Sequence, residues 1–111
     1  MVARFSPPAP LSHRLILQSR NDTAQQEGEL VTHWTTIAKV WGALIDSRVT
    51  RKEEAQQMVE VAQHRIIIRH RDDVASGWRF LLDARELDIR TVIDPDQTGR
   101  FLSCLCEEAA R

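Results

Sequence analysis

The sequence predicts a mainly β fold, a small antiparallel β-barrel or sandwich of five to six strands with one short helix and long loops. Short segments rich in Val, Ile, Leu and Trp recur along the chain, and several alternate apolar with polar residues. Polar or turn-forming clusters separate these segments at fairly regular spacing. At 111 residues, the chain is long enough for one compact core and too short for two.

The first ten residues predict an extended N-terminal arm, and we expect residues 11–108 to form a single domain. The arm contains FSPPAP and lacks the basic, apolar and cleavage regions of a signal peptide. No apolar run approaches the roughly 20 residues that a membrane-spanning helix needs, so we expect no membrane partner. Cys104 and Cys106 are too close on one strand for an easy disulfide, which favours a reducing, cytosolic setting.

Two strands and one long loop are expected in the N-terminal half. Residues 13–19 place Leu15 and Leu17 on one face of a strand. Residues 37–45 predict a second strand, both faces of which are partly apolar. The polar segment between them, residues 21–30, has no apolar periodicity and predicts an exposed loop.

The middle of the chain is where a helix competes with a strand. Thr50 and Glu53 have the spacing of a capping box. Apolar residues follow at helical spacing: Ala55, Met58, Val59 and Ala62. We therefore expect a short helix over residues 50–58, followed by a strand to about His70, where the period changes to two.

The C-terminal third predicts a hairpin and a final strand. Residues 78–89 alternate apolar and polar residues on either side of a polar turn at residues 83–85. Pro95 ends this hairpin, because proline lacks the donor that a strand ladder needs. The last strand is expected over residues 100–108.

The residues that could carry out chemistry do not form a catalytic or metal-binding motif. No nucleophile is framed by a Gly-rich elbow, a Walker loop or a His-Glu helix motif, so we expect no enzyme activity and no cofactor. The possible zinc ligands are His64, His70, Cys104 and Cys106, but the cysteines form C-x-C on a strand instead of a C-x2-C knuckle. We keep a small metal-dependent or thiol enzyme as one hypothesis for this chain.

Nucleic-acid binding is a stronger alternative, and it depends on the segment QHRIIIRHRDD. Arg65, Arg69 and Arg71 share one face of the expected strand at intervals of about 7 Å, a spacing comparable with phosphates along one strand. The same pattern suits a solvated strand face, and the net charge of −1 provides no global attraction to DNA. Ile67 lies on this arginine face, where an exposed isoleucine indicates packing against a neighbouring subunit.

A set of segments in a fixed order resembles the phage head-tail joining family, the head-completion or stopper proteins of long-tailed bacteriophages and gene-transfer particles. The segments are LSHRLILQSR, THWTTIAKVWGALI, VEVAQHRIIIRHRDDV, WRFLLDARELDIRTVIDPDQ and RFLSCLCEE. They span nearly all of residues 11–108. One departure is the hairpin turn, which often carries paired glycines in such proteins and is Asp83-Ala84-Arg85 here.

The resemblance implies a structural protein of the virion neck, or connector, assembled in the cytoplasm of a bacterial host. The implied function is a homo-oligomeric ring, of six or twelve subunits in such proteins, that closes the DNA channel after packaging and offers a docking surface to the tail. Portal and adaptor proteins would lie above the ring and a tail or tail-terminator protein below it. Packaged DNA would occupy its lumen transiently.

The resemblance also assigns candidate sites. Residues 21–30 and 46–57 correspond to the long loops that act in this family, and the candidate channel gate is Arg51, Lys52, Glu53 and Glu54. The arginine face then becomes a candidate subunit interface with acidic residues of the next subunit, a head-to-tail contact that closes a ring. Its candidate residues are Arg65, Ile67, Arg69, Arg71, Asp94 and Asp96.

Overall fold

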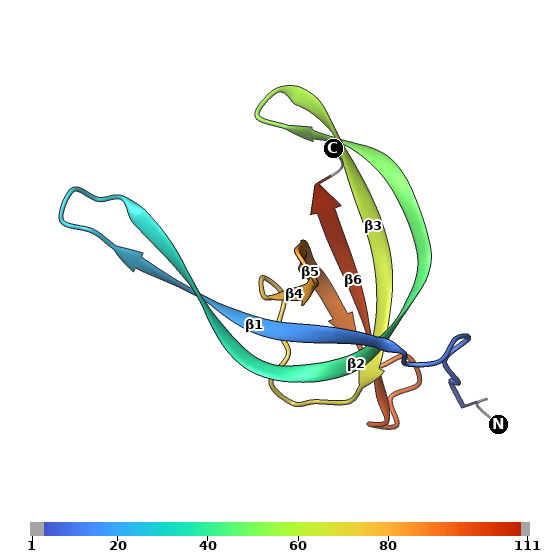
Figure 1. The fold of residues 1–111 in the computed structure, drawn as a ribbon. Helices are drawn as coiled ribbons and strands as arrows, with labels where there is room; N and C mark the ends of the chain where they lie inside the picture. Colours follow the sequence, from blue (N-terminus) through green and yellow to red (C-terminus); the bar gives the residue numbers. More distant parts are fainter. Residues whose placement is uncertain (1–3, 110–111) are drawn as a thin grey trace.

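The computed structural model describes residues 4–109, which form six antiparallel strands in one closed sheet (Figure 1). The strands are β1 (His13–Ala24), β2 (Leu30–Glu54), β3 (Gln57–Arg69), β4 (Arg79–Leu82), β5 (Arg85–Ile93) and β6 (Phe101–Ala109). Their order is β1-β2-β3-β6-β5-β4, and β4 pairs back with β1. The mainly β class is confirmed, and the closure makes one continuous ring of strands instead of two stacked sheets.

The core fills the inside of this ring. Alternate residues of five strands point inward and are buried: Leu15, Leu17, Ile66, Ile68, Phe80, Leu87, Ile89, Leu102, Cys104 and Cys106. Gly42 on β2 lies against this cluster, and a Cβ there would come within 2.6 Å of Leu15 Cδ1. Glycine at this position therefore lets β2 approach the core side chains of its neighbour.

The predicted helix over residues 50–58 is wrong, because the segment forms a β-hairpin. β2 continues to Glu54 and β3 begins at Gln57, with Thr50 paired to Val61 across the ladder. Ala55 and Gln56 form the connecting turn with φ of 49° and 64°, as a type I′ turn requires. The ladder with β3 provides the backbone hydrogen bonds that a helix would have formed internally. Strand pairing therefore outweighs the helical spacing of the apolar residues.

Half of the long loop expected over residues 21–30 is strand. β1 runs to Ala24 and β2 begins at Leu30, so the connection is a tight turn. The Gly28 N–H donates to the Gln25 carbonyl at 3.0 Å, and the Gln25 N–H donates to the Glu29 carbonyl at 2.7 Å. Gly28 has a φ of 83°, which fits the left-handed position that ends a three-residue hairpin loop.

Two hairpin arms extend beyond the ring and give the molecule its elongated shape, 55 × 30 × 28 Å (Figure 1). The β1–β2 arm comprises residues 19–35, and the β2–β3 arm comprises residues 48–60; neither pairs with a third strand among the described residues. A register shift marks the base of each arm. Ile37 is the extra residue at the first, and Asp46 with Ser47 lies opposite His64 at the second.

The C-terminal hairpin and the final strand are confirmed. β4 and β5 flank a turn at Asp83 and Ala84, β5 ends at Ile93 just before the Asp-Pro-Asp segment, and β6 follows. Of the predicted N-terminal arm, residues 1–3 lie outside the described residues. The Phe5 N–H donates to Asp96 Oδ2 at 2.8 Å, which attaches the described part of the arm to the β5–β6 connection.

Candidate functional site

The two cysteines lie inside the ring and are poor nucleophiles. Cys104 and Cys106 are fully buried on β6. Burial raises the pKa of Cys104 to about 12, and burial together with the neighbouring Cys104 raises the pKa of Cys106 further. Because the thiolate is the reactive form, neither side chain is activated at neutral pH.

The four possible zinc ligands do not converge. His64 lies opposite Cys106 in the β3–β6 register, but His70 lies beyond the end of β3 and is 3.7 Å from Asp72. Among residues 4–109, no three or more His, Cys, Asp or Glu side chains are placed to hold a metal ion. The described chain likewise contains no helix that could cross a membrane.

A partly buried network at the base of the β2–β3 arm, centred on the buried His64, was not predicted from the sequence. Ser47 Oγ lies 2.7 Å from His64 Nδ1, and His64 Nε2 lies 3.0 Å from Glu108 Oε1. Arg85 Nε and Nη2 donate to the two Glu108 oxygens, each at 2.8 Å. These residues are 17 to 44 positions apart from His64 and form no sequence motif, so only the strand pairing brings them together.

The electrostatics of this network indicate a structural role. The hydrogen bonds from Arg85, opposed in part by burial and assisted by His64, lower the pKa of Glu108 to about 2. The composition Ser, His and Glu resembles a catalytic triad, but the carboxylate is already neutralised by a bidentate guanidinium. The contacts among Ser47, His64, Arg85 and Glu108 join β2, β3, β5 and β6 at one end of the ring.

The buried carboxylate of the neighbouring residue, Glu107, ties the β2–β3 arm to the ring. Glu107 Oε1 accepts from Lys52 Nζ at 3.0 Å and from Arg90 Nε at 2.9 Å, while Gln63 donates to Oε2 at 3.3 Å. Burial opposes ionisation, but the bonds from Lys52, Gln63 and Arg90 outweigh it and lower the pKa of Glu107.

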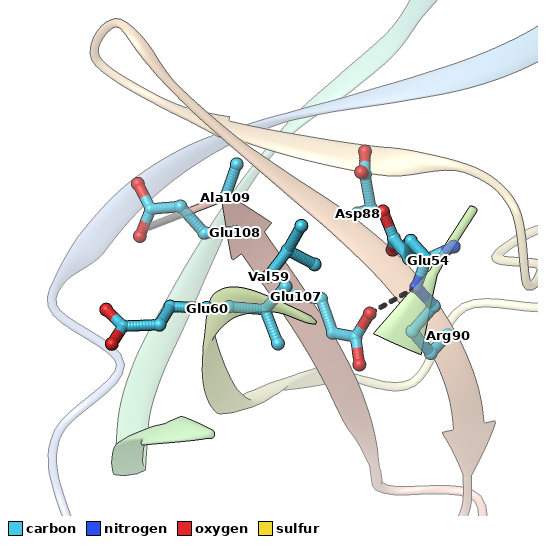
Figure 2. A pocket seen from close by; sticks show the side chains of 9 residues that line it. Glu54, Val59, Glu60, Asp88, Arg90, Glu107, Glu108 and Ala109 are labelled. Carbon is cyan, nitrogen blue, oxygen red and sulfur yellow. Dashed lines mark hydrogen bonds and ion pairs between the residues drawn. The ribbon is translucent and has the colours of Figure 1, made fainter. Parts of the chain in front are cut away.

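A cavity of about 600 Å³ lies beside Glu107, between the arm, the middle of β5 and the end of β6 (Figure 2). It is lined by Glu54, Val59, Glu60, Val61, Asp88, Arg90, Glu107, Glu108 and Ala109. Figure 2 shows Arg90 directed toward Glu107, and this ion pair fixes the one cationic side chain among the described residues that line the cavity.

The four candidate gate residues lie on a strand near the tip of the β2–β3 arm. Because side chains alternate along a strand, they divide between its two faces. Lys52 and Glu54 share the face that is turned toward Glu107, with their charged groups 3.7 Å apart. Arg51 and Glu53 lie on the other face and are exposed.

The candidate interface residues on β3 differ in their surroundings. Arg65 Nη1 donates to Ser103 Oγ at 2.8 Å, and Arg71 pairs with Asp73 at 3.0 Å. Arg69 is exposed, and no carboxylate within the described chain lies at ion-pair distance from it. The expectation that Ile67 is exposed is wrong, since its side chain is completely buried.

The burial of Ile67 follows from its place in the register. Its partners across the ladder are Ala43 and Ser103, which are also buried, so this part of the outer wall is covered. Arg65 reaches across it to Ser103. In this conformation Ile67 has no surface to offer another subunit.

The two candidate acidic residues are held within the β5–β6 connection. Asp94 Oδ2 accepts from the Gly99 N–H at 2.7 Å. Asp96 accepts hydrogen bonds from Thr98, from the Phe5 N–H and from Arg100, and these bonds hold its pKa well below the usual range.

Comparison with known proteins supports one family. A sequence model described as "Phage head completion protein" matches residues 7–109. The fold is similar to a chain in "Virion of native gene transfer agent (GTA) particle", with a TM-score of 0.73, 21% identity, and coverage of 89% of this chain and 94% of that chain. It is also similar to the solution structure of protein SF1141 from Shigella flexneri 2a, with a TM-score of 0.59, 25% identity, and coverage of 91% and 95% of the two chains.

No curated protein sequence matches the chain significantly. The family match nevertheless extends over nearly the whole described sheet, from the N-terminal arm to the end of β6. The order of segments that suggested a head-tail joining protein is therefore confirmed at the level of the family: the chain belongs to the phage head completion proteins.

Proposed function

We propose that this chain forms a ring at the virion neck, closes the DNA channel after packaging and provides a docking surface for the tail. As a phage head completion protein, it is a structural component of the virion. Its partners in this proposal are other copies of itself, the portal and adaptor proteins on the head side, and a tail or tail-terminator protein on the other side. Packaged DNA would contact the lumen of the ring only transiently.

The observation that carries the proposal is the pair of arms that project from a closed body. Most side chains of residues 19–35 and 48–60 are exposed, and each arm is a two-stranded ribbon. An isolated two-stranded ribbon is only marginally stable in water. Arms of this kind gain buried surface by contacting other subunits, as an assembly protein requires.

The β2–β3 arm is the better candidate for the gate. Arg51, Lys52, Glu53 and Glu54 sum to zero charge, which suits a surface that meets DNA without retaining it, because each fixed phosphate contact adds affinity. The Lys52–Glu107 ion pair holds the arm to the ring. Loss of this one pair would release that attachment between arm tip and β6.

A shortened arm tests the gate. Replacing residues 51–60 with Asn-Gly joins the paired residues Thr50 and Val61 by a two-residue turn and preserves the register of the remaining ladder. The variant would be added to DNA-filled heads that carry the portal and adaptor of the same particle. We expect electron microscopy to show a ring on the portal and the packaged DNA to become nuclease-sensitive.

The matched control keeps the β2–β3 arm at full length and replaces only its turn residues, Ala55 and Gln56, with Asn-Gly. It leaves the candidate gate intact. Heads that retain DNA with the shortened β2–β3 arm would refute the gate assignment. Wild-type chain that forms no ring on the portal would refute the neck function as a whole.

A further inference from the structure

Two arginine side chains flank an exposed tryptophan on the outer wall of the ring near the start of β1. Arg14 lies opposite Trp41, and its guanidinium carbon is 4.8 Å from the centroid of the Trp41 ring. The pairing of Gly42 with Ile68 places Trp41 beside Arg69 on the next strand. We call Arg14, Trp41 and Arg69 the Arg–Trp row.

The Arg–Trp row is open and lacks counter-charges. Trp41 is 51% exposed, although large aromatic residues are usually well buried. Among residues 4–109, no carboxylate lies at ion-pair distance from Arg14, Arg69 or the neighbouring Lys39. Exposed aromatic and arginine side chains in one patch are typical of the centre of a protein interface.

The tip of the β1–β2 arm has the complementary character. Glu27 and Glu29 are exposed and have no cationic partner within the described chain. Leu30 follows them and is 71% exposed. The nearest arginine on the arm, Arg20, is already paired with Asp22 at 3.1 Å. We call Glu27, Glu29 and Leu30 the acidic tip.

The row and the tip cannot meet within one chain. Arg14 is at the start of β1 and the tip lies beyond its end, about 33 Å away along an extended strand. In Figure 1 the start of β1 and the tip of the β1–β2 arm lie on opposite sides of the molecule. Two complementary patches on opposite sides of a subunit produce a head-to-tail contact, and repetition of such a contact closes a ring.

We propose that the acidic tip docks on the Arg–Trp row of a second copy of this chain. The contact would pair the Glu27 and Glu29 carboxylates with the Arg14 and Arg69 guanidiniums and pack Leu30 on the Trp41 ring. This inference rests on the proposed ring and names the surfaces that join its subunits. Of the interface residues that the sequence suggested on β3, it retains Arg69.

Engineered disulfides test the contact directly. Gln26→Cys, beside the acidic tip, and Lys39→Cys, on the same outer face as Trp41, would be placed on separate chains and mixed with the portal–adaptor complex of the same particle. Both native cysteines are buried, so mild oxidation should join only the engineered ones. The matched control is Gln57→Cys, an exposed glutamine near the tip of the other arm.

We expect a disulfide between the Gln26→Cys and Lys39→Cys chains. The Gln57→Cys and Lys39→Cys chains should form little disulfide. Glu27→Lys with Glu29→Lys should lower the yield by about tenfold, because like charges then face each other. Arg14→Glu with Arg69→Glu in the partner chain should restore it.

The remaining outcomes refute the contact in distinguishable ways. A ring seen by microscopy with no more disulfide than the control would overturn the docking and leave the neck function standing. Absence of any ring would overturn both. Binding of a labelled single-stranded oligonucleotide that Arg14→Glu with Arg69→Glu abolishes, without the disulfide, would assign the row to nucleic acid instead.

Discussion

Replacement of Glu108 by glutamine should destabilise the protein at neutral pH and destabilise it less in acid. The substitution keeps the shape of the side chain but removes the charge that Arg85 and His64 contact. A fall in the Glu108 pKa from 4.5 to about 2 corresponds to about 3 kcal/mol of stability at neutral pH. Because 20% of the side chain is exposed, we expect solvent screening to reduce the measured value to about 2 kcal/mol.

The direction of the pH dependence follows from the lowered pKa. The unfolded chain binds a proton at Glu108 more readily than the folded chain, so acid favours unfolding. The stabilisation is complete above the unfolded pKa of 4.5 and is lost as the pH falls toward 2. The difference between wild type and Glu108→Gln should therefore be largest near neutrality and shrink steadily below pH 4.5.

Urea unfolding followed by tryptophan fluorescence, at about pH 7 and about pH 3, measures this difference. Glu86→Gln is the control, since Glu86 also binds an arginine, Arg79 at 2.6 Å, but is 57% exposed. Loss of the Glu86–Arg79 ion pair should lower the free energy of unfolding by less than about 1 kcal/mol. Equal effects of the two substitutions, or a Glu108→Gln effect that does not change with pH, would refute the reasoning.

Two further predictions concern the core. Gly42→Ala should lower the free energy of unfolding by about 1–3 kcal/mol, because its Cβ would overlap Leu15 Cδ1, and an unchanged melting temperature would contradict this. Cys104 and Cys106 should resist a thiol reagent in the native protein and both react after denaturation, whereas rapid labelling of the native chain would show that the ring opens easily.

The sequence predicts the strands of the ring well and the arms poorly, for a physical reason. Strands with one face in the core alternate apolar and polar residues, and this pattern locates β1 and the β4–β5 hairpin. Residues 21–24 are exposed on both faces, so no alternation arises and the segment resembles a loop. The tip at Ala55 and Gln56 lacks the glycine or asparagine that usually marks such a turn.

The candidate sites were predictable only where they depend on local sequence. The charged group at residues 51–54 is visible in the sequence, but its division between two strand faces depends on the hairpin that replaces the expected helix. The surroundings of Ile67 and the contacts of His64 depend on residues more than 30 positions away, Ser103 and Glu108. Such contacts follow from the pairing of β3 with β6, which no local pattern specifies.

The closure of the sheet also determines how the free subunit is protected against aggregation. Unpaired backbone groups along a strand edge can template the addition of further strands and so lead to fibrils. In the body of the ring every strand has neighbours on both sides, which leaves the most apolar segments without an accessible edge. Within residues 4–109, open strand edges are concentrated in the two arms, where charged side chains such as Arg20, Asp22, Arg51 and Glu53 discourage uncontrolled pairing. Subunits can then accumulate before assembly without polymerising through their apolar strands.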